Sequence, residues 1–304
     1  MLFVLKFIQV WRLVRETRLE DEESETLLSS PTTPDEMLDL IDLGASKKFT
    51  DGQGGRMWTI DPIDGTQTFI QGGQYCVVAA LLLDGKEKVG VLGCPHIRFP
   101  TSLTPSSKIP VSDSEICGKG EGSLVVAIKS HGVFIRHLSY GKLLPNVHTI
   151  PFGKDEKAVS FDSGSAVEPL RIVENSRSST PQYSRRHLAA ESLMSPWPPQ
   201  SIFSTQIKYV ACALGAADVH LRIPESPLKR GYVWDHAGGA LIFEETGGKV
   251  TDLAGRDLDF TKGAKLQGNW GICAAPKVVH GAVLEKIQQV LSQEKTYAEL
   301  VNVG

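Results

Sequence analysis

The chain has 304 residues, of which 41% are hydrophobic and 22% charged, so it is long enough for one large domain or two smaller ones with real cores. The formal net charge of −3 argues against a general nucleic-acid-binding protein. The five cysteines form no CxxC pair, which argues against a zinc site and predicts buried thiols in a reducing compartment.

Residues 1–19 carry apolar side chains at helical spacing and predict an amphipathic helix. Lys6 and Gln9 interrupt the apolar run, which is too short to span a bilayer. No small-residue cleavage site follows, only Arg12 and the acidic run 20–25, so neither a signal peptide nor a membrane segment is expected. Cytoplasm is therefore the default expectation for location.

A short helix is predicted next. Thr33 is a suitable N-cap, Pro34 fits the first helical position, Glu36 completes a capping box, and Gly44 is placed to end the helix. A polar, glycine-rich loop is expected over residues 45–56. This loop leads into the most informative stretch of the chain.

That stretch is Trp58 to Thr66, with the string DPIDGT at 61–66. Apolar Trp58 and Ile60 predict the end of a buried strand, and Pro62 is expected to stop its hydrogen-bond ladder. The chain would then leave the sheet edge with two carboxylates close together and no neighbouring lysine.

Asp61 and Asp64 would repel each other and have raised pKa values unless a cation neutralises them. Oxygen ligands on a rigid turn suit a hard divalent ion such as Mg²⁺. Gly65 lets a backbone amide approach a ligand, and Thr66 begins an expected helical turn whose amides favour a phosphate oxygen. An isolated DxxD is more often an ordinary turn with Asx-type hydrogen bonds, but the full string is more specific.

Two strand pairs are predicted after this turn, and they make residues 1–160 a β-rich α/β region. The first pair is joined by the turn Asp84–Lys86 and the second by residues 129–132, while residues 140–157 predict a surface hairpin. The expected strands cover 74–84, 88–95, 122–128 and 133–138.

The next region, 161–204, is rich in serine and proline and predicts a loosely ordered stretch. Arg185, Arg186 and His187 could contact phosphate there, although solvated surface is the more common role of such residues. Regular structure is predicted to return in a third region, 205–304.

In this third region a small-residue helix over 209–215 and a strand over 217–224 are expected. Lys208 and Arg222 are single basic residues in apolar surroundings. Such residues often only extend their charged ends to water, but beside a phosphate site they become candidate anion ligands.

The string WDHAGG at 234–239 precedes an apolar helix. Asp235 is placed where an N-cap belongs, and Gly247 where the helix should end. The Asp235 carboxylate could also face a cation, with Ala237 and Gly238 leaving room for substrate, while His236 by itself is expected to be structural. Strands over 249–252 and 269–275 and a helix over 281–294 complete the prediction.

DPIDGT together with WDHAGG resembles the inositol-monophosphatase-like superfamily of Mg²⁺-dependent, Li⁺-sensitive phosphatases. Within it the chain is most similar to the 3'(2'),5'-bisphosphate nucleotidases of fungal and plant type. The similarity covers most of residues 34–160 and 205–291. The residues that carry this narrower resemblance are Ile41–Gly44, Gly72–Tyr75, Val91–Pro95, Gln206–Tyr209 and Asp218–Pro224.

The resemblance implies a layered α-β-α-β sandwich that hydrolyses the 3'-phosphate of adenosine 3',5'-bisphosphate to AMP, a clearance step that supports sulfate assimilation. It implies a small-molecule nucleotide substrate, Mg²⁺ as cofactor, and neither nucleic acid nor membrane as partner. By matching position, the implied metal ligands are Asp61, Asp64, Asp235 and the Ile63 carbonyl. Thr66 would orient the attacking water as a catalytic residue with Asp64, and the implied substrate-binding residues are Gly65, Thr66, Lys208, Arg222 and Asp235.

The chain also departs from the family pattern. Family members carry a segment ahead of residue 1 that supplies a metal-binding glutamate and a water-activating aspartate, so an N-terminally truncated sandwich is expected. Glu22-Glu23-Ser24 mimics the glutamate motif without its glycine, and the family's His-Ser-Ser stretch, expected after Pro169, is missing. Three hypotheses therefore stay open: an impaired nucleotidase, an inositol phosphate phosphatase, and a non-catalytic remnant that binds nucleotide.

Overall fold

The computed structural model describes residues 2–18, 25–26, 29–45, 55–98, 111–113, 116–118, 121–138, 148–149, 169–175, 182–193, 195–196 and 199–301. The chain divides into two compact units, Met1–Phe49 and Thr50–Gly304, and each is described by itself.

The first unit contains the helices α1 (Leu2–Glu16) and α3 (Pro34–Ala45), as the sequence predicts. At the start of α3 the Thr33 hydroxyl accepts a 3.1 Å hydrogen bond from the Glu36 amide. The Glu36 carboxylate in turn accepts from the Thr32 amide at 2.7 Å. The predicted cap is therefore present, with the glutamate bond made one residue earlier than in a standard capping box.

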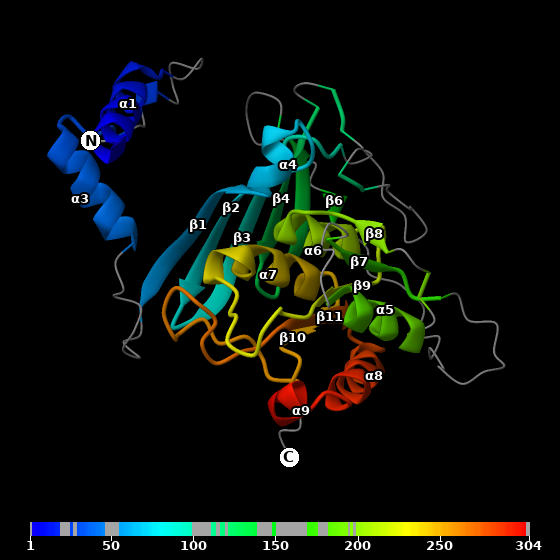
Figure 1. Ribbon diagram of the computed structural model, residues 1–304. Coiled ribbons are helices and arrows are strands. Elements are labelled where there is room, and N and C mark those ends of the chain that lie inside the picture. The colour runs from blue at the N-terminus through cyan, green and yellow to red at the C-terminus, as the bar shows by residue number, and fades with distance from the viewer. Residues whose placement is uncertain are drawn as a thin grey trace. The chain divides into compact units, whose positions relative to one another are not determined.

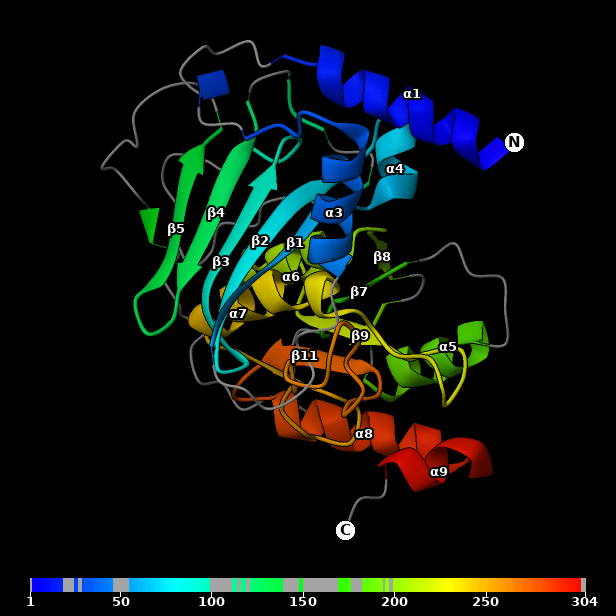
Figure 2. The ribbon, with the colours of Figure 1, turned by 90° about the vertical axis from the view of Figure 1, so that its left-hand side faces the viewer.

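The second unit begins with an antiparallel sheet, which Figures 1 and 2 show as a twisted wall of blue, cyan and green strands. Asp84 and Gly85 have φ of +52° and +70°, the left-handed pair that a two-residue hairpin turn requires, and both predicted strand pairs are confirmed. The described strands, in sheet order, are β1 (Arg56–Asp64), β2 (Cys76–Leu83), β3 (Lys86–Cys94), β4 (Ser123–Ile128), β5 (Gly132–His137) and β6 (His148–Thr149).

The strand β1 differs from its prediction in two ways. Trp58 and Ile60 are 52% and 59% exposed, and it is Thr59 between them that is buried. The strand also does not end at Pro62 but continues to Asp64 with one extra residue, because Asp61 lies opposite Val78 and Asp64 opposite Cys76. A bulge on an edge strand tolerates the missing amide hydrogen of Pro62, since that position has no ladder bond to lose.

The prediction of a loosely ordered stretch over 161–204 is wrong for its described residues. They form β7 (Ile172–Glu174), α5 (Gln182–Ser192) and β8 (Gln200–Ser201). The strand β7 is buried and pairs in parallel with β8 and with β9 (Val219–Arg222). A three-residue strand that is buried at every position has no alternation of apolar and polar residues that would reveal it in the sequence.

The second sheet is mixed and has the order β10-β11-β9-β7-β8 among the described strands. Two predicted strands are confirmed in it as β10 (Gly248–Thr251) and β11 (Ile272–Pro276). Its far face packs on α5 and on α8 (His280–Ser292), whose Val283, Ile287 and Leu291 are buried in the core as the apolar pattern predicts. A last helix, α9 (Lys295–Val301), follows.

Two helices, α6 (Thr205–Ala213) and α7 (Ala237–Glu245), lie between the sheets, so the second unit is layered sheet, helices, sheet, helices (Figure 2). This arrangement confirms the predicted α/β sandwich. A Cβ added to Gly238 would lie 2.8 Å from a methyl carbon of Val78. The prediction that Gly238 leaves room for substrate is therefore wrong. The absence of a side chain at Gly238 lets α7 pack closely on the first sheet.

All five cysteines lie among the described residues, and none forms a disulfide. Four are buried and Cys117 is half-buried, which confirms the predicted thiols. Burial raises the pKa of the Cys273 thiol to about 12, so this group stays protonated and inert. Within the part of the chain that the structure describes, no helix combines the length and the apolar character needed to cross a membrane.

Candidate active site

Three carboxylates meet at the open end of the helix layer. Asp61 and Asp64 come from the bulged end of β1, and Asp235 from the 3-10 turn η1 (Val233–Asp235) that precedes α7. One ligand atom from each lies within 4.8 Å of the others, and this is the one such acidic group found among the described residues. The fold thus joins the two motifs that the sequence singled out.

The prediction that Asp235 caps the following helix is wrong. His236 occupies the N-cap of α7 without a capping bond from its own side chain, and the Gln206 side chain accepts from the Gly239 amide of the first turn at 2.7 Å. The short 3-10 turn inserts before α7 and moves Asp235 out of the capping position. Its carboxylate is therefore directed to the acidic cluster instead of the helix amides.

Burial dominates the electrostatics of the cluster. Burial and, after it, the charge of the neighbouring Asp64 together raise the pKa of Asp61 to about 6. The pKa of Asp64 and that of Asp235 are likewise raised by burial, with Arg222 partly offsetting the effect on Asp235. Three carboxylates that resist ionisation form a site that a cation would stabilise.

Asp64 is held from the opposite side by the start of α6. The Ser204 hydroxyl and the Gln206 amide both donate to its Oδ2, the amide at 2.7 Å. Ser204 is also the N-cap of α6, because its oxygen accepts the Ile207 amide at 3.1 Å. The helix N-terminus therefore stabilises this carboxylate and fixes its orientation.

The turn after Asp64 has the conformation that its sequence requires. Gly65 has φ of +89°, and a Cβ there would lie 2.9 Å from the Cβ of Ser204. Thr66 starts the five-residue helix α4 (Thr66–Ile70) and donates its hydroxyl proton to the Ile63 carbonyl at 2.9 Å. The residues that the resemblance selected here, Asp61, Ile63, Asp64, Gly65, Thr66 and Asp235, line one shallow pocket.

A second pocket adjoins the first and shares Asp64 and Asp235 with it. Four basic side chains and four carboxylates line it, and we call it the basic pocket after Lys208 and Arg222. Lys208 lies on its wall, almost fully buried, and burial followed by the charge of Arg222 lowers its pKa to about 8. Arg222, at the end of β9, places Nη1 3.6 Å from Oδ2 of Asp235. Both predicted anion ligands are thus within the same cleft as the acidic cluster.

Sequence reasoning missed several residues of this cleft. Glu174 is buried and paired with Arg186 at 3.5 Å, so the expectation that Arg186 is solvated surface is wrong. Burial raises the pKa of Glu174 to about 7, against the opposing charge of Arg186. Ser204 could have been found, since a serine before a small-residue helix is an N-cap signal. The contacts of Ser204 and Gln206 with Asp64 could not have been found in this way.

The donor set fits a hard divalent cation. It consists of three carboxylates, all oxygen ligands, with burial that leaves them short of compensating charge. The basic pocket beside it offers an ammonium and a guanidinium to an anion. A cation next to an anion-binding wall is the arrangement that phosphoryl transfer uses.

The sequence matches the family model described as the inositol monophosphatase family over residues 16–292. It is 37% identical to a 3'(2'),5'-bisphosphate nucleotidase of Emericella nidulans over 284 residues, which are 93% of this chain and 76% of that protein. It is 32% identical to 3',5'-bisphosphate nucleotidase 2 of Arabidopsis thaliana over 288 residues, 94% of this chain and 74% of that protein.

Among solved structures, the chain is similar to SaIMPase-II with 2'AMP bound. The TM-score is 0.55 at 16% sequence identity, over 97% of this chain and 93% of the other. At this identity the likeness bears on the fold alone, and it agrees with the layered sandwich described above.

Proposed function

This chain belongs to the inositol monophosphatase family, and we propose that it works as a 3'(2'),5'-bisphosphate nucleotidase with Mg²⁺ as its metal. It is a hydrolase that removes the 3'-phosphate of adenosine 3',5'-bisphosphate and leaves AMP. The observation that carries the proposal is the cluster of Asp61, Asp64 and Asp235 opening directly on a basic pocket. The names of its relatives select the nucleotide among phosphate esters.

Asp61, Asp64, Asp235 and the Ile63 carbonyl would hold the metal. When bound, Mg²⁺ supplies Lewis-acid polarisation of the phosphoryl group and lowers the pKa of water. The N-terminus of α6 keeps Asp64 in the orientation that this requires, through the bonds from Ser204 and Gln206.

Thr66 is suited to orient the attacking water. Its hydroxyl proton is already donated to the Ile63 carbonyl, so the oxygen presents its lone pairs outward. A water that donates to this oxygen has its own lone pair directed away from Thr66, and the reacting phosphorus must lie on that side. The side chain is exposed in the pocket, where water can reach it.

Lys208 and Arg222 would hold the anionic groups of the substrate. Lys208 is buried and Arg222 partly buried, and charges in such surroundings gain strength from the lower local dielectric. A guanidinium also binds phosphate with two parallel bonds. Gly65 supports the same end of the site by allowing the tight turn between Asp64 and Thr66.

The test is phosphate release from adenosine 3',5'-bisphosphate beside inositol 1-phosphate, with Mg²⁺ and with or without Li⁺. We expect Mg²⁺-dependent, Li⁺-sensitive release from the nucleotide, reduced about 100-fold or more in Asp64→Asn, the range seen when a preorganised electrostatic group is lost. Faster release from inositol 1-phosphate would make the chain an inositol phosphate phosphatase. No release from either ester by folded protein would contradict the proposal and favour a nucleotide-binding remnant.

A further inference from the structure

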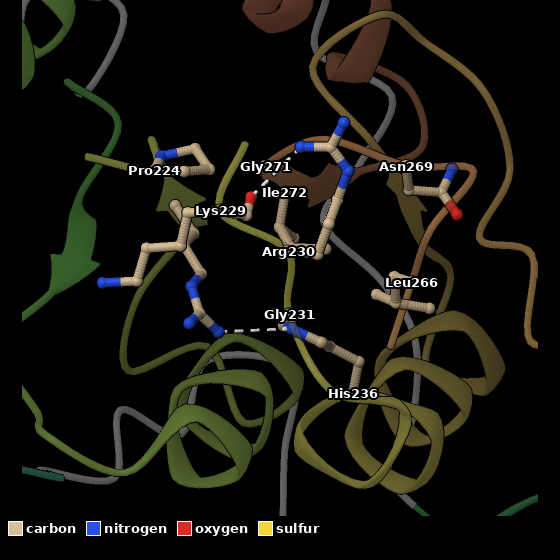
Figure 3. Close-up of a pocket in the computed structure, with 10 residues that line it drawn as sticks. Pro224, Lys229, Arg230, Gly231, His236, Leu266, Asn269, Gly271 and Ile272 are labelled. Carbon is tan, nitrogen blue, oxygen red and sulfur yellow. Dashed lines mark hydrogen bonds between the residues drawn. The ribbon is translucent and has the colours of Figure 1, made fainter. Parts of the chain in front are cut away.

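Three elements meet behind the basic pocket through one buried histidine. His236, at the N-cap of α7, lies 3.0 Å from the Tyr209 hydroxyl of α6 through Nδ1. Its Nε2 lies 3.3 Å from Nη1 of Arg222, at the end of β9. Figure 3 shows His236 beside Gly231 at the base of a small pocket, with a dashed line marking the bond to the guanidinium.

The chemistry of the partners fixes the tautomer of this ring. A guanidinium can only donate, so Nε2 of His236 must be the acceptor of the bond from Arg222. The ring proton is then on Nδ1 and is donated to the oxygen of Tyr209. Each nitrogen has one role, and exchanging the roles would place two N–H groups against each other.

Packing fixes the position of the ring as tightly as hydrogen bonding fixes its tautomer. His236 is fully buried. A Cβ added to Gly231 would lie 2.7 Å from its Nε2 and 3.1 Å from its Cδ2, so only glycine fits against this edge of the ring. The guanidinium of Arg222 therefore donates to an acceptor whose position is fixed by packing.

Arg222 has a competing partner. Oδ2 of Asp235 lies 3.6 Å from the same Nη1, close enough for attraction but beyond a hydrogen bond. If Nε2 were lost, the guanidinium would move towards this carboxylate, because a charged pair with direct hydrogen bonds is stronger than one without. Arg222 would then leave the position proposed for the substrate's anionic group and pair with a carboxylate of the proposed metal site.

We propose that His236 is a positioning residue, whose Nε2 holds the Arg222 guanidinium towards the substrate's anionic group and keeps it from closing on Asp235. This inference rests on the proposed function, because the orientation of Arg222 matters only if Arg222 binds substrate. Tyr209 and Gly231 support the same task by fixing the tautomer and the place of the ring.

The two side-chain amides provide a matched pair of variants. In His236→Gln the amide oxygen reaches about as far as Nε2 and can accept from Arg222, whereas in His236→Asn the polar group reaches only the Nδ1 position. We expect His236→Gln to keep most of the affinity for AMP, and His236→Asn to bind AMP about tenfold more weakly, the loss typical of one hydrogen bond to a charged group. Calorimetric titration of AMP in EDTA measures this without turnover.

Kinetics add a readout that general loosening of the fold would not give. With Mg²⁺ and adenosine 3',5'-bisphosphate, His236→Asn should raise KM about tenfold and change kcat much less, since uniform binding is lost. Gly231→Ala should act in the same direction, because its new Cβ displaces the ring.

The controls come from the same unit. His280 is also buried and bonded, to Thr251 and the Cys273 carbonyl, but lies away from the cleft. His280→Asn should therefore cost stability and leave the AMP dissociation constant unchanged. Gly281→Ala, where a Cβ meets nothing within 4 Å, is the control for Gly231→Ala.

Equal AMP affinity of folded His236→Gln and His236→Asn would overturn the inference, whether both match the unsubstituted protein or both are weakened. If the unsubstituted protein neither binds AMP nor hydrolyses the nucleotide, the proposed function fails and the inference fails with it. If the unsubstituted protein is active but His236→Gln and His236→Asn bind AMP equally well, the positioning role of His236 is contradicted while the proposed function stands.

Discussion

The main-chain amide of Gln206 donates a 2.7 Å hydrogen bond to Oδ2 of Asp64, and so connects the first turn of α6 to the end of β1. These residues are 142 positions apart in the chain. The acidic cluster therefore forms only when the helix layer has docked on the first sheet, and the strength of the metal site is coupled to this docking.

The Ser204 hydroxyl should contribute to both stability and metal binding. Ser204→Ala removes the N-cap of α6 and one donor to the buried Asp64 carboxylate. We expect a loss of about 1–2 kcal/mol in the free energy of unfolding, measured by urea denaturation in EDTA. The stabilisation gained on adding Mg²⁺ should also be smaller than in the unsubstituted protein.

Ser292→Ala is the matched control, because among the described residues that exposed hydroxyl donates to the Gln289 carbonyl of its own helix and not to the site. A Ser204→Ala protein with unchanged unfolding free energy and an unchanged response to Mg²⁺ would contradict the coupling.

The turn glycine Gly65 should be irreplaceable for two separable reasons. Gly65→Ala strains a backbone with φ of +89° and places a Cβ 2.9 Å from that of Ser204. Gly72→Ala strains a similar φ of +75° but meets nothing within 4 Å, so it isolates the backbone cost of about 1 kcal/mol. Thermal unfolding should show a larger loss for Gly65→Ala, and only that variant should lose phosphatase activity.

If the two alanine variants are equally destabilised and equally active, steric contact with Ser204 has no role. The site would then depend on the backbone conformation alone.

The metal-free protein should become more stable when Asp61 is neutralised. The folded pKa of about 6 lies above the unfolded value of about 3.9, so ionised Asp61 destabilises the fold above pH 6. The penalty shrinks as pH falls from about 6 and is lost below about pH 4, where the group becomes protonated in both states. Urea denaturation in EDTA should therefore show Asp61→Asn more stable than the unsubstituted protein at pH 7.5, with the difference lost below about pH 4.

With Mg²⁺ at pH 7.5, the unsubstituted protein should become more stable than Asp61→Asn. At a concentration 100 times its dissociation constant, a bound ion adds about 2.7 kcal/mol to the unsubstituted protein, and Asp61→Asn should gain far less. Equal gains in both proteins would remove Asp61 from the metal site.

Lys208 should set an alkaline limit on substrate use. Its pKa of about 8 means that the free enzyme loses this positive charge as pH rises through 8, so kcat/KM for the nucleotide should fall there. Lys208→Met keeps the apolar stem without the charge and should lower kcat/KM about tenfold or more at pH 7. This variant should also lack the decline above pH 8.

The exposed Lys277 provides the control, since Lys277→Met should leave the pH profile unchanged. A decline above pH 8 that persists in Lys208→Met belongs to another group.

Much of the site could be predicted from short strings of sequence. DPIDGT and WDHAGG supplied Asp61, Asp64 and Asp235, because proline, glycine and threonine at fixed offsets specify a turn that only a few functions need. The hairpin at Asp84 and Gly85 was likewise visible, since its left-handed pair depends on adjacent residues. The backbone conformation of a turn can be predicted from sequence when the residues of the turn themselves determine it.

Burial and pairing were less readable. Trp58 and Ile60 were assigned to the core by their apolar character, but alternation along β1 places Thr59 inward instead. The strand β7 gave no signal because its three residues are all buried and show no alternation, and its pairing with β8 and β9 appears only in the fold. Both errors concern which face or which partner an element selects, and that is decided by the rest of the fold.

The sequence alone determined which functional groups this protein has and the local turns that present them, since each motif carries its own backbone constraints. Only the tertiary structure decided that Ser204 and Gln206 hold Asp64, that Asp235 faces the acidic cluster, and that His236 receives Arg222. These contacts join residues from separate sheets and helices. Their geometry follows from how the layers pack, and no short window of sequence contains it.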